Sequence, residues 1–452
     1  MSPPPVIEKL VVAHYMLGLT HLQTRKEWEA DIHAARDMGI DGFALNIGRD
    51  DSWNLEQLDL AFRGEDALST RQGFRLFLSF DMADPGQPWS VEQVVRYITM
   101  FARRRSYLRA RDGRAVVSTF EGTGWADNWP DCEDAAQGIF LVPAWTSLGP
   151  QGVEKKLDMI VGAFNWACWP EAGSKTMTAD ADEAYRRILG NDKAYMMGAS
   201  PWFYTNLPQY SKNWAPTCTT LWFDRWAQVL AENPDLVQIV TWNDYGESSY
   251  LTTPPRPGGG HPRHRQIIVA GAERYVVECD HRAFGRVVRY FARMFKMGLY
   301  DGAADALALA REDEQCLVAW YRTDVIGVGA DEDGTVWGEF GTSPASHGTD
   351  DVISIIVIHD TPKPVTVSFG NPEISRPMPA RHAAATTIAE PIRSVGSAHL
   401  YVVPIQGRVG EVTVSMGRGS SGQGRAWRTV TGPAIRRRKG GKVNFNVVTI
   451  GC

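Results

Sequence analysis

The chain has 452 residues and a formal net charge of −5, with 44% hydrophobic and 22% charged residues. These values are ordinary for a soluble globular protein and give no indication of nucleic acid or an anionic membrane as a partner. Because the length exceeds what one compact core usually holds, we expect two domains.

The cysteines and the amino terminus exclude further classes. The six cysteines include no CxxC pair, which argues against zinc knuckles and thioredoxin-like sites, and their even number permits disulfides without implying them. The first residues lack the order of a signal peptide, and no stretch approaches the roughly 18 apolar residues of a membrane span. We expect a soluble chain that either stays inside the cell or has lost its export signal.

Short apolar runs rich in β-forming residues recur through the first part of the chain. They cover residues 10–17, 42–48, 75–81, 115–122, 138–145, 159–166, 194–202 and 236–244. Several are separated by segments with helical spacing, such as Trp28, Ile32 and Ala35, and a final helix follows from Phe284 to Phe295. Eight alternating strands and helices predict an α/β fold, a (β/α)8 TIM-type barrel. An open doubly wound sheet would need GxGxxG spacing after the first strand, which is absent.

Polar or aromatic residues stand where each predicted strand ends. Barrel active sites are built from the carboxyl ends of strands and the loops that follow. Any one such residue could simply cap a strand where it meets solvent, but the whole series favours a shared binding mouth. The residues are His14, Asn46, Asp81, Glu121, Trp145, Asn165 with Trp166, Trp202 with Tyr204, and Asn243 with Asp244.

After Gly298 the helical spacing gives way to short alternating strands separated by turn residues. They are expected at 315–322, 335–340, 352–359, 364–370, 399–405, 411–416 and 442–450. We therefore expect a catalytic barrel over residues 1–300 and a C-terminal antiparallel β-sandwich over residues 301–452. The second domain is expected to be a packing partner or a carbohydrate-binding module, and the basic run at 436–439 a solvated loop.

The mixture of carboxylates and aromatic rings at the mouth indicates glycoside hydrolysis. That reaction needs one carboxylic acid to protonate the departing oxygen and one carboxylate to activate water or attack the sugar. Asp244 and Glu247 are separated by a turn at Gly246, so both could overhang one pocket, although the same spacing fits a simple turn cap. Further candidates are the carboxylates Asp81 and Glu121 and the ring-holding walls Trp145, Trp166, Trp202 and Tyr204.

The strand-end segments resemble, in order, those of glycoside hydrolase family 71, the α-1,3-glucanases or mutanases. The resemblance covers the whole barrel. It rests on residues 13–16 (AHYM), 43–48 (FALNIG), 77–82 (FLSFDM), 118–122 (STFEG), 142–146 (VPAWT), 164–166 (FNW), 200–206 (SPWFYTN), 212–214 (KNW) and 242–248 (WNDYGES). The chain departs from the family after Ser248, in a Pro/Gly-rich insertion that bears on subsite shape.

The resemblance implies endo-type hydrolysis of α-1,3-glucosidic bonds in a neutral glucan, with inversion and without a metal or organic cofactor. It implies Asp244 and Glu247 as the catalytic pair. By position, we expect Glu247 on the loop to be the acid and Asp244 at the strand end to be the base. The expected partner is the polysaccharide, with no nucleic acid or membrane, and the protein is expected to be a monomer. The family also suggests a secreted or cell-wall-acting enzyme.

Three alternatives stay open. The same barrel could hydrolyse another α-glycan, since a fold does not fix a substrate. It could be a catalytically silent polysaccharide-binding protein, although the presence of both Asp244 and Glu247 argues against this. A metal-dependent hydrolase could use His261 and His264, but their Gly/Pro-rich loop lacks the strand or helix that fixes ligand geometry.

Overall fold

The structure of the chain is a computed structural model. It describes residues 7–68, 73–84, 86–171, 174–215, 217–255, 266–299, 310–325, 349–370, 385–417, 428–437 and 443–452. The predicted strand at 335–340, the pair His261 and His264, and much of the basic run at 436–439 lie outside these residues.

Parallel strands form a TIM-like barrel, as predicted. They lie in the order β5-β4-β3-β2-β1-β10-β7-β6. A hydrogen bond of 3.2 Å from the Val161 amide to the Leu141 carbonyl joins the two edges. The strands are buried on both faces, which explains their continuous apolar sequences. Their bounds are β1 (Leu10–Met16), β2 (Gly42–Ile47), β3 (Arg75–Asp81), β4 (Ala115–Phe120), β5 (Ile139–Ala144), β6 (Gly162–Asn165), β7 (Ala194–Ala199) and β10 (Leu236–Ile239).

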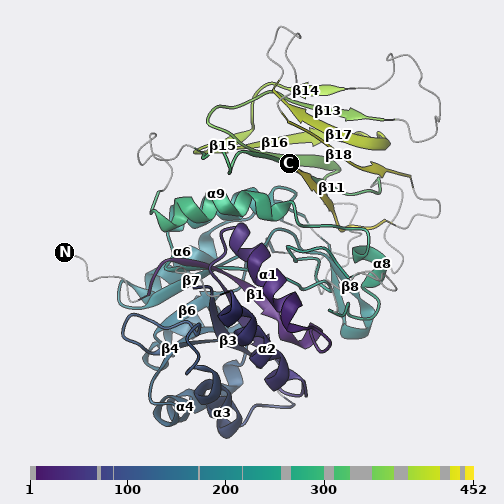
Figure 1. Ribbon diagram of the computed structural model, residues 1–452. Helices are drawn as coiled ribbons and strands as arrows, with labels where there is room; N and C mark the ends of the chain where they lie inside the picture. Colours follow the sequence, from purple (N-terminus) through teal and green to yellow (C-terminus); the bar gives the residue numbers. More distant parts are fainter. Residues whose placement is uncertain are drawn as a thin grey trace.

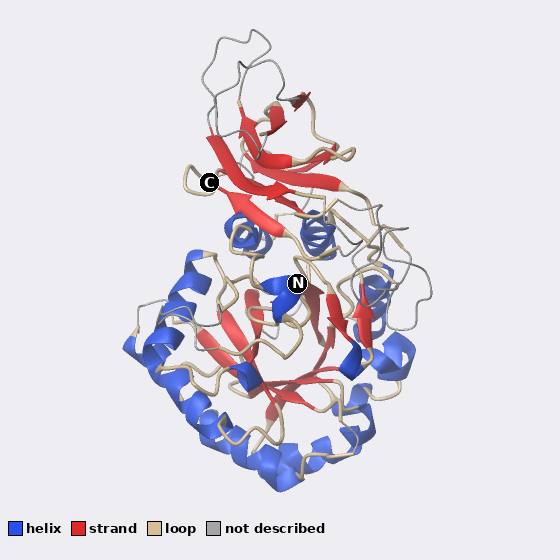
Figure 2. Cartoon of the chain, turned by 90° about the vertical axis from the view of Figure 1, so that its right-hand side faces the viewer, coloured by secondary structure: helices blue, strands red, loops and turns tan. Residues whose placement is uncertain are grey.

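Helices surround the barrel strands on the outside (Figure 2). In α1 the apolar stripe of Trp28, Ile32 and Ala35 is buried, as its spacing predicted. At the start of α3, Ser90 and Gln93 form a reciprocal capping box that satisfies backbone amides of the first turn. The helices are α1 (Arg25–Asp37), α2 (Asn54–Ala67), α3 (Val91–Phe101), α4 (Trp129–Ala135), α5 (Gly149–Glu154), α6 (Asp180–Leu189), α7 (Leu221–Glu232), α8 (Glu273–Val276) and α9 (Phe284–Lys296).

Short elements elaborate the loops at the carboxyl ends of the strands. A small antiparallel hairpin of β8 (Thr205–Leu207) and β9 (Lys212–Trp214) stands between β7 and α7. Several connections also contain one turn of 3-10 helix. These turns are η1 (Leu17–Leu19), η2 (Thr123–Asn128), η3 (Thr146–Leu148), η4 (Leu157–Met159) and η5 (Pro208–Tyr210).

The carboxyl-terminal part of the chain forms two antiparallel sheets. One has the order β15-β16-β12-β11-β19 and the other the order β14-β13-β17-β18. The continuously apolar β12 lies inside its sheet, between β16 and β11, as expected. The strands are β11 (Cys316–Tyr321), β12 (Val352–Ile358), β13 (Val365–Phe369), β14 (Thr386–Ile388), β15 (Arg393–Val395), β16 (Ala398–Pro404), β17 (Gly410–Met416), β18 (Arg428–Ile435) and β19 (Val448–Gly451).

Helix α9 lies between the barrel and the antiparallel sheets (Figure 1). The ring centroids of Phe284 in α9 and Trp320 in β11 are 5.5 Å apart. The Tyr290 hydroxyl of α9 accepts a 2.7 Å hydrogen bond from the Ser397 amide. Trp320 Nε1 also donates to the Thr219 carbonyl at 2.9 Å. Apolar side chains of both parts therefore belong to one continuous buried cluster.

Candidate active site

The segment after β10 is tied to β1 and carries the predicted catalytic pair. The strand itself ends at Ile239, earlier than predicted, but the chain stays beside the barrel wall. The Trp242 amide donates to the His14 carbonyl at 2.8 Å. Asn243 Oδ1 then accepts a 2.8 Å hydrogen bond from the Met16 amide. These contacts place Asp244 at the carboxyl end of the barrel, directly after the two anchored residues.

Asp244 is a partly buried carboxylate held by the backbone of its own turn. Its Oδ1 accepts from the Glu247 amide at 3.0 Å, and its own amide donates to Thr241 Oγ1 at 2.8 Å. Burial, and then the negative charge of Glu247, raise the pKa of Asp244 to about 7. Near neutral pH this carboxyl group can therefore either hold or accept a proton, as a general acid or base must.

Glu247 lies at the solvent edge of the same turn. Its Oε1 accepts a 2.8 Å hydrogen bond from Lys212 Nζ, which comes from strand β9. The Glu247 side chain is 18% exposed and that of Lys212 48%. The Glu247 carbonyl also accepts from the Tyr204 amide at 2.9 Å. The β8–β9 hairpin thus holds the second carboxylate where a ligand could reach it.

Asp81, at the end of β3, belongs to the same electrostatic neighbourhood. Burial raises the pKa of Asp81, and the nearby Glu247 raises it further, whereas Lys212 lowers it. Its Oδ1 accepts from the Ala83 amide at 3.1 Å. The structure therefore brings together three predicted carboxylates, Asp81, Asp244 and Glu247, around Lys212.

His14 and Trp166 meet in the barrel mouth. Their ring centroids lie 4.8 Å apart in an edge-to-face arrangement. Burial lowers the pKa of His14 to about 3, so the imidazole is neutral, and its Nδ1 lies 3.1 Å from Gln238 Nε2. Trp166 is partly exposed, unlike the other predicted rings. It is therefore the predicted aromatic residue best placed to meet a sugar.

Two buried donors among the predicted residues have no hydrogen-bond partner within the described chain. They are Asn46 Nδ2 and Trp145 Nε1. A buried donor left unpaired costs about 1–3 kcal/mol, so such groups usually meet water or a ligand. Glu121, by contrast, is fully engaged: Ser147 donates to it from both its hydroxyl (2.6 Å) and its amide (3.1 Å).

Of the four aromatic walls predicted to hold a sugar ring, three are buried: Trp145, Trp202 and Tyr204. Their exposed fractions are 1%, 1% and 2%. Trp202 Nε1 donates to the Phe445 carbonyl at 3.3 Å, and the Tyr204 ring lies 5.9 Å from that of Phe445. These rings pack against the protein, so they offer no open face to a sugar.

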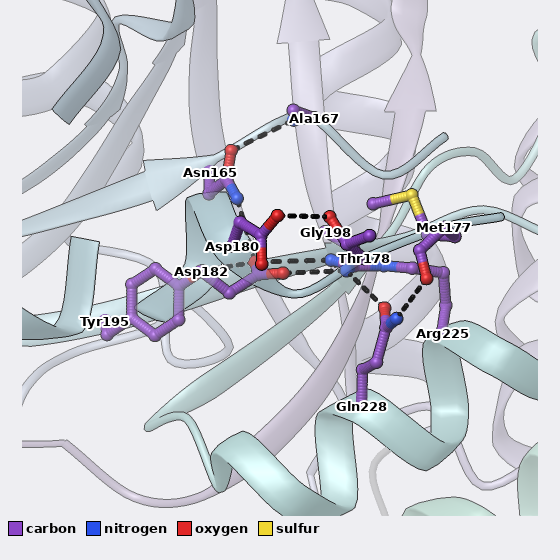
Figure 3. A network of polar contacts seen from close by, with 10 residues as sticks. All are labelled: Asn165, Ala167, Met177, Thr178, Asp180, Asp182, Tyr195, Gly198, Arg225 and Gln228. Carbon is purple, nitrogen blue, oxygen red and sulfur yellow. Dashed lines mark hydrogen bonds and ion pairs between the residues drawn. The ribbon is translucent and has the colours of Figure 1, made fainter. Parts of the chain in front are cut away.

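Asn165 lies in a separate buried network (Figure 3). Its Nδ2 donates to Asp182 Oδ1 at 2.8 Å, and Asp182 forms a 2.7 Å ion pair with Arg225 in which both side chains are 0% exposed. Asn243 is likewise consumed by backbone contacts with Met16. Both predicted site residues therefore hold the loops in place, and their amides are already paired.

The sequence model of glycosyl hydrolase family 71 matches residues 7–451. The chain belongs to this family. It is 34% identical over 329 residues to "Glucan endo-1,3-alpha-glucosidase agn1" of Schizosaccharomyces pombe, with 70% of each chain covered. It is 32% identical to the "Ascus wall endo-1,3-alpha-glucanase" of the same yeast, over 64% of this chain and 66% of the relative. It is 30% identical to "Mutanase Pc12g07500" of Penicillium rubens, over 80% of this chain and 76% of the relative.

As a member of family 71 the chain is a glycosidase. The described residues contain no group of three or more His, Cys, Asp or Glu side chains arranged to hold a metal ion. Among the described helices, none is long and apolar enough to pass through a membrane.

Sequence reasoning gave no role to Lys212 in this family 71 site, although the segment Lys212–Trp214 was among the matching motifs.

Proposed function

We propose that this glycosidase cleaves α-1,3-glucosidic bonds inside α-1,3-glucan, with Asp244 and Glu247 as its acid–base pair and with inversion at the anomeric carbon. The observation that carries the proposal is the pair itself. Two partly buried carboxylates share one turn at the carboxyl end of the barrel, and Lys212 pairs with one of them, Glu247. The family and the activities in the names of its relatives support the substrate.

The charge state of the pair suits this chemistry. Burial, and then the charge of Glu247, raise the pKa of Asp244 to about 7, and Lys212 Nζ donates a 2.8 Å hydrogen bond to Glu247. Together the two groups can hold one proton and one negative charge, the combination that acid–base glycoside cleavage needs. Inversion further requires a gap of about 6.5–9.5 Å between the carboxyl groups for the attacking water.

Position favours Glu247 as the acid of the pair, whereas electrostatics favour Asp244. Glu247 at the edge can reach a glycosidic oxygen more easily, as the acid must. In the free enzyme, burial favours the proton on Asp244. The proposal is therefore for the pair as a unit, and an activated substrate assigns the roles. A good leaving group needs no protonation, so it should restore activity to the acid variant and not to the base variant.

We propose that substrate contacts come from the remaining mouth residues that are not consumed by the fold. These are His14, Asn46, Asp81 and Trp166, whereas Glu121 already accepts two hydrogen bonds from Ser147. The unpaired Asn46 Nδ2 and the partly exposed Trp166 ring support this. Polar and aromatic groups of this kind suit an uncharged polysaccharide.

We also propose that the chain divides near residue 300 into the barrel and a β-sandwich, and that it acts as a monomer. In support of the sandwich, both antiparallel sheets contribute to one apolar cluster, which includes Leu317 and Val357 from one sheet and Val367 and Val414 from the other. The contacts of α9 with both parts support a packing role for this region.

The test is incubation of the purified enzyme with insoluble α-1,3-glucan, α-1,4-glucan and β-1,3-glucan, followed by sizing of the released sugars. We expect oligosaccharides from α-1,3-glucan alone. Cleavage of another α-glycan instead would overturn the specificity. Tight binding to α-1,3-glucan without any release would favour the silent binding protein.

A further inference from the structure

The side chain of Gln266 contacts the turn at residues 243–247, called the catalytic turn below because it carries Asp244 and Glu247. It is 7% exposed, and its Oε1 accepts two hydrogen bonds. One comes from the Tyr245 hydroxyl at 2.8 Å and the other from Asn243 Nδ2 at 3.2 Å. Asn243 and Tyr245 are the two sequence neighbours of Asp244. A single amide oxygen therefore holds the residues on either side of that carboxylate.

The other end of the same amide is fixed to the barrel wall. Gln266 Nε2 lies 2.7 Å from the Tyr15 hydroxyl in β1, 2.9 Å from Gln23 Oε1 and 3.1 Å from Asp31 Oδ2 in α1. The Tyr15 hydroxyl in turn donates to Asp31 Oδ2 at 2.6 Å. These partners are buried, so their hydrogen bonds are shielded from water and keep a defined geometry.

Asp244 itself makes local hydrogen bonds with Thr241 and Glu247, so its place relative to the barrel depends on what holds the turn that carries it. The β10 ladder ends at Ile239, so no strand hydrogen bonds hold residues 243–246. Beyond Gln266, the turn is held by the Asn243 contacts with Met16 and by the 2.7 Å hydrogen bond from the Tyr275 hydroxyl to the Gly246 carbonyl. Gln266 connects both neighbours of Asp244 to Tyr15 in β1 and Asp31 in α1.

We propose that Gln266 is a positioning residue for the Asp244–Glu247 pair: its amide locks the catalytic turn to β1 and α1. The inference rests on the proposed function of that pair. A displacement of about 1 Å in a reacting group can cost on the order of 100-fold in rate, so this lock would act on the chemical step more than on substrate binding.

The test compares Gln266→Met with Gln228→Met. Both replace an amide by an apolar side chain of similar length. Gln228 is a matched control because its Nε2 donates to the Met177 carbonyl at 2.7 Å, in the Asp182–Arg225 network and not in the catalytic turn (Figure 3). For Gln266→Met we expect kcat to fall by on the order of 10- to 100-fold with KM changed less than about 2-fold. Gln228→Met should keep the kcat of the parent enzyme per folded molecule.

Folding is measured in parallel by thermal unfolding, and Tyr245→Phe provides a second variant that removes only one hydroxyl. It should lower kcat by about 3- to 10-fold, again without a matching rise in KM. Folded Gln266→Met or Tyr245→Phe with full kcat would overturn the inference, as would a rise in KM alone. If the parent enzyme itself releases nothing from α-1,3-glucan, the proposed function has failed. That result is distinct from failure of the positioning role.

Discussion

The barrel holds two ion pairs of similar length in very different surroundings. Asp182 and Arg225 meet at 2.7 Å with both side chains fully buried, and Asn165, Tyr195 and the Gly198 carbonyl complete their hydrogen bonds (Figure 3). Glu247 and Lys212 meet at 2.8 Å at the solvent edge, beside Asp244, whose pKa is raised by burial. A buried carboxylate with a full set of partners, such as Asp182, has a structural role. A carboxylate with a raised pKa and no ion pair of its own, such as Asp244, is a candidate for catalysis.

The largest effect should come from removing the charge of the solvent-edge carboxylate. Glu247→Gln should lose several orders of magnitude in kcat on α-1,3-glucan, because its amide can neither donate an acidic proton nor act as a base. The melting temperature should change little, since the Lys212 contact is exposed and worth at most about 1 kcal/mol. Near-full activity of a folded Glu247→Gln variant would remove this residue from the pair.

The opposite pattern is expected for the buried ion pair. Arg225→Met leaves Asp182 charged, buried and without its cation, which should lower the free energy of unfolding by about 3–5 kcal/mol. Activity per folded molecule should stay close to that of the parent enzyme at low temperature. Denaturant unfolding checks this prediction, and a loss below about 1 kcal/mol would show that the pair is not structurally important.

Asp244 should also make the free energy of unfolding depend on pH. Its pKa is raised by burial to about 7 in the folded state, so the folded protein binds more protons than the unfolded chain between about pH 4 and pH 7. The stabilising contribution is therefore complete below about pH 4 and is lost as the pH rises through 7. Asp244→Asn should be more stable than the parent at pH 8, by up to about 4 kcal/mol, with a smaller difference at pH 4. Equal differences at both pH values would contradict the raised pKa.

The smallest effect is expected when the partly exposed ring of Trp166 is removed, and it is compared with removal of the buried ring of Trp202. Trp166→Ala should raise KM for glucan, or lower kcat/KM, by about 1–2 kcal/mol in free energy, because the partly exposed ring can stack on sugar. Trp202→Ala should mainly lower the melting temperature, since that ring is 1% exposed and donates to Phe445. If Trp202→Ala instead raises KM in a fully stable protein, the ring contacts substrate after all.

The barrel was predictable from sequence because buried parallel strands leave long apolar runs. The predicted bounds run past several strands, most of all past β10, which ends at Ile239 before Asn243 bonds to Met16 through its side chain. In the antiparallel part, β14 and β15 were missed because each has only three residues. Strand β18 was missed because Gly432 and Pro433 interrupt its pattern.

The sequence predicted where the site residues lie along the chain, but not which way their side chains point. The sequence pattern predicted Asp81, Asp244 and Glu247 for the site. In the structure the charge of Glu247 raises the pKa of both aspartates, so the three carboxylates lie near one another. Sequence cannot say which way a ring points, so buried Trp202 was expected in the mouth. Gln266 has no motif signal at all, because its partners in β1, α1 and the catalytic turn are far away along the chain.

One matched experiment tests the distinction between the two pairs most directly. Asp244→Asn and Asp182→Asn make the same chemical change at the two sites, and each variant is measured for kcat on α-1,3-glucan per folded molecule and for free energy of unfolding. We predict that Asp244→Asn is folded and loses several orders of magnitude in kcat, while Asp182→Asn is destabilised by several kcal/mol and keeps its activity. A folded and active Asp244→Asn variant would contradict the assignment of Asp244 to catalysis.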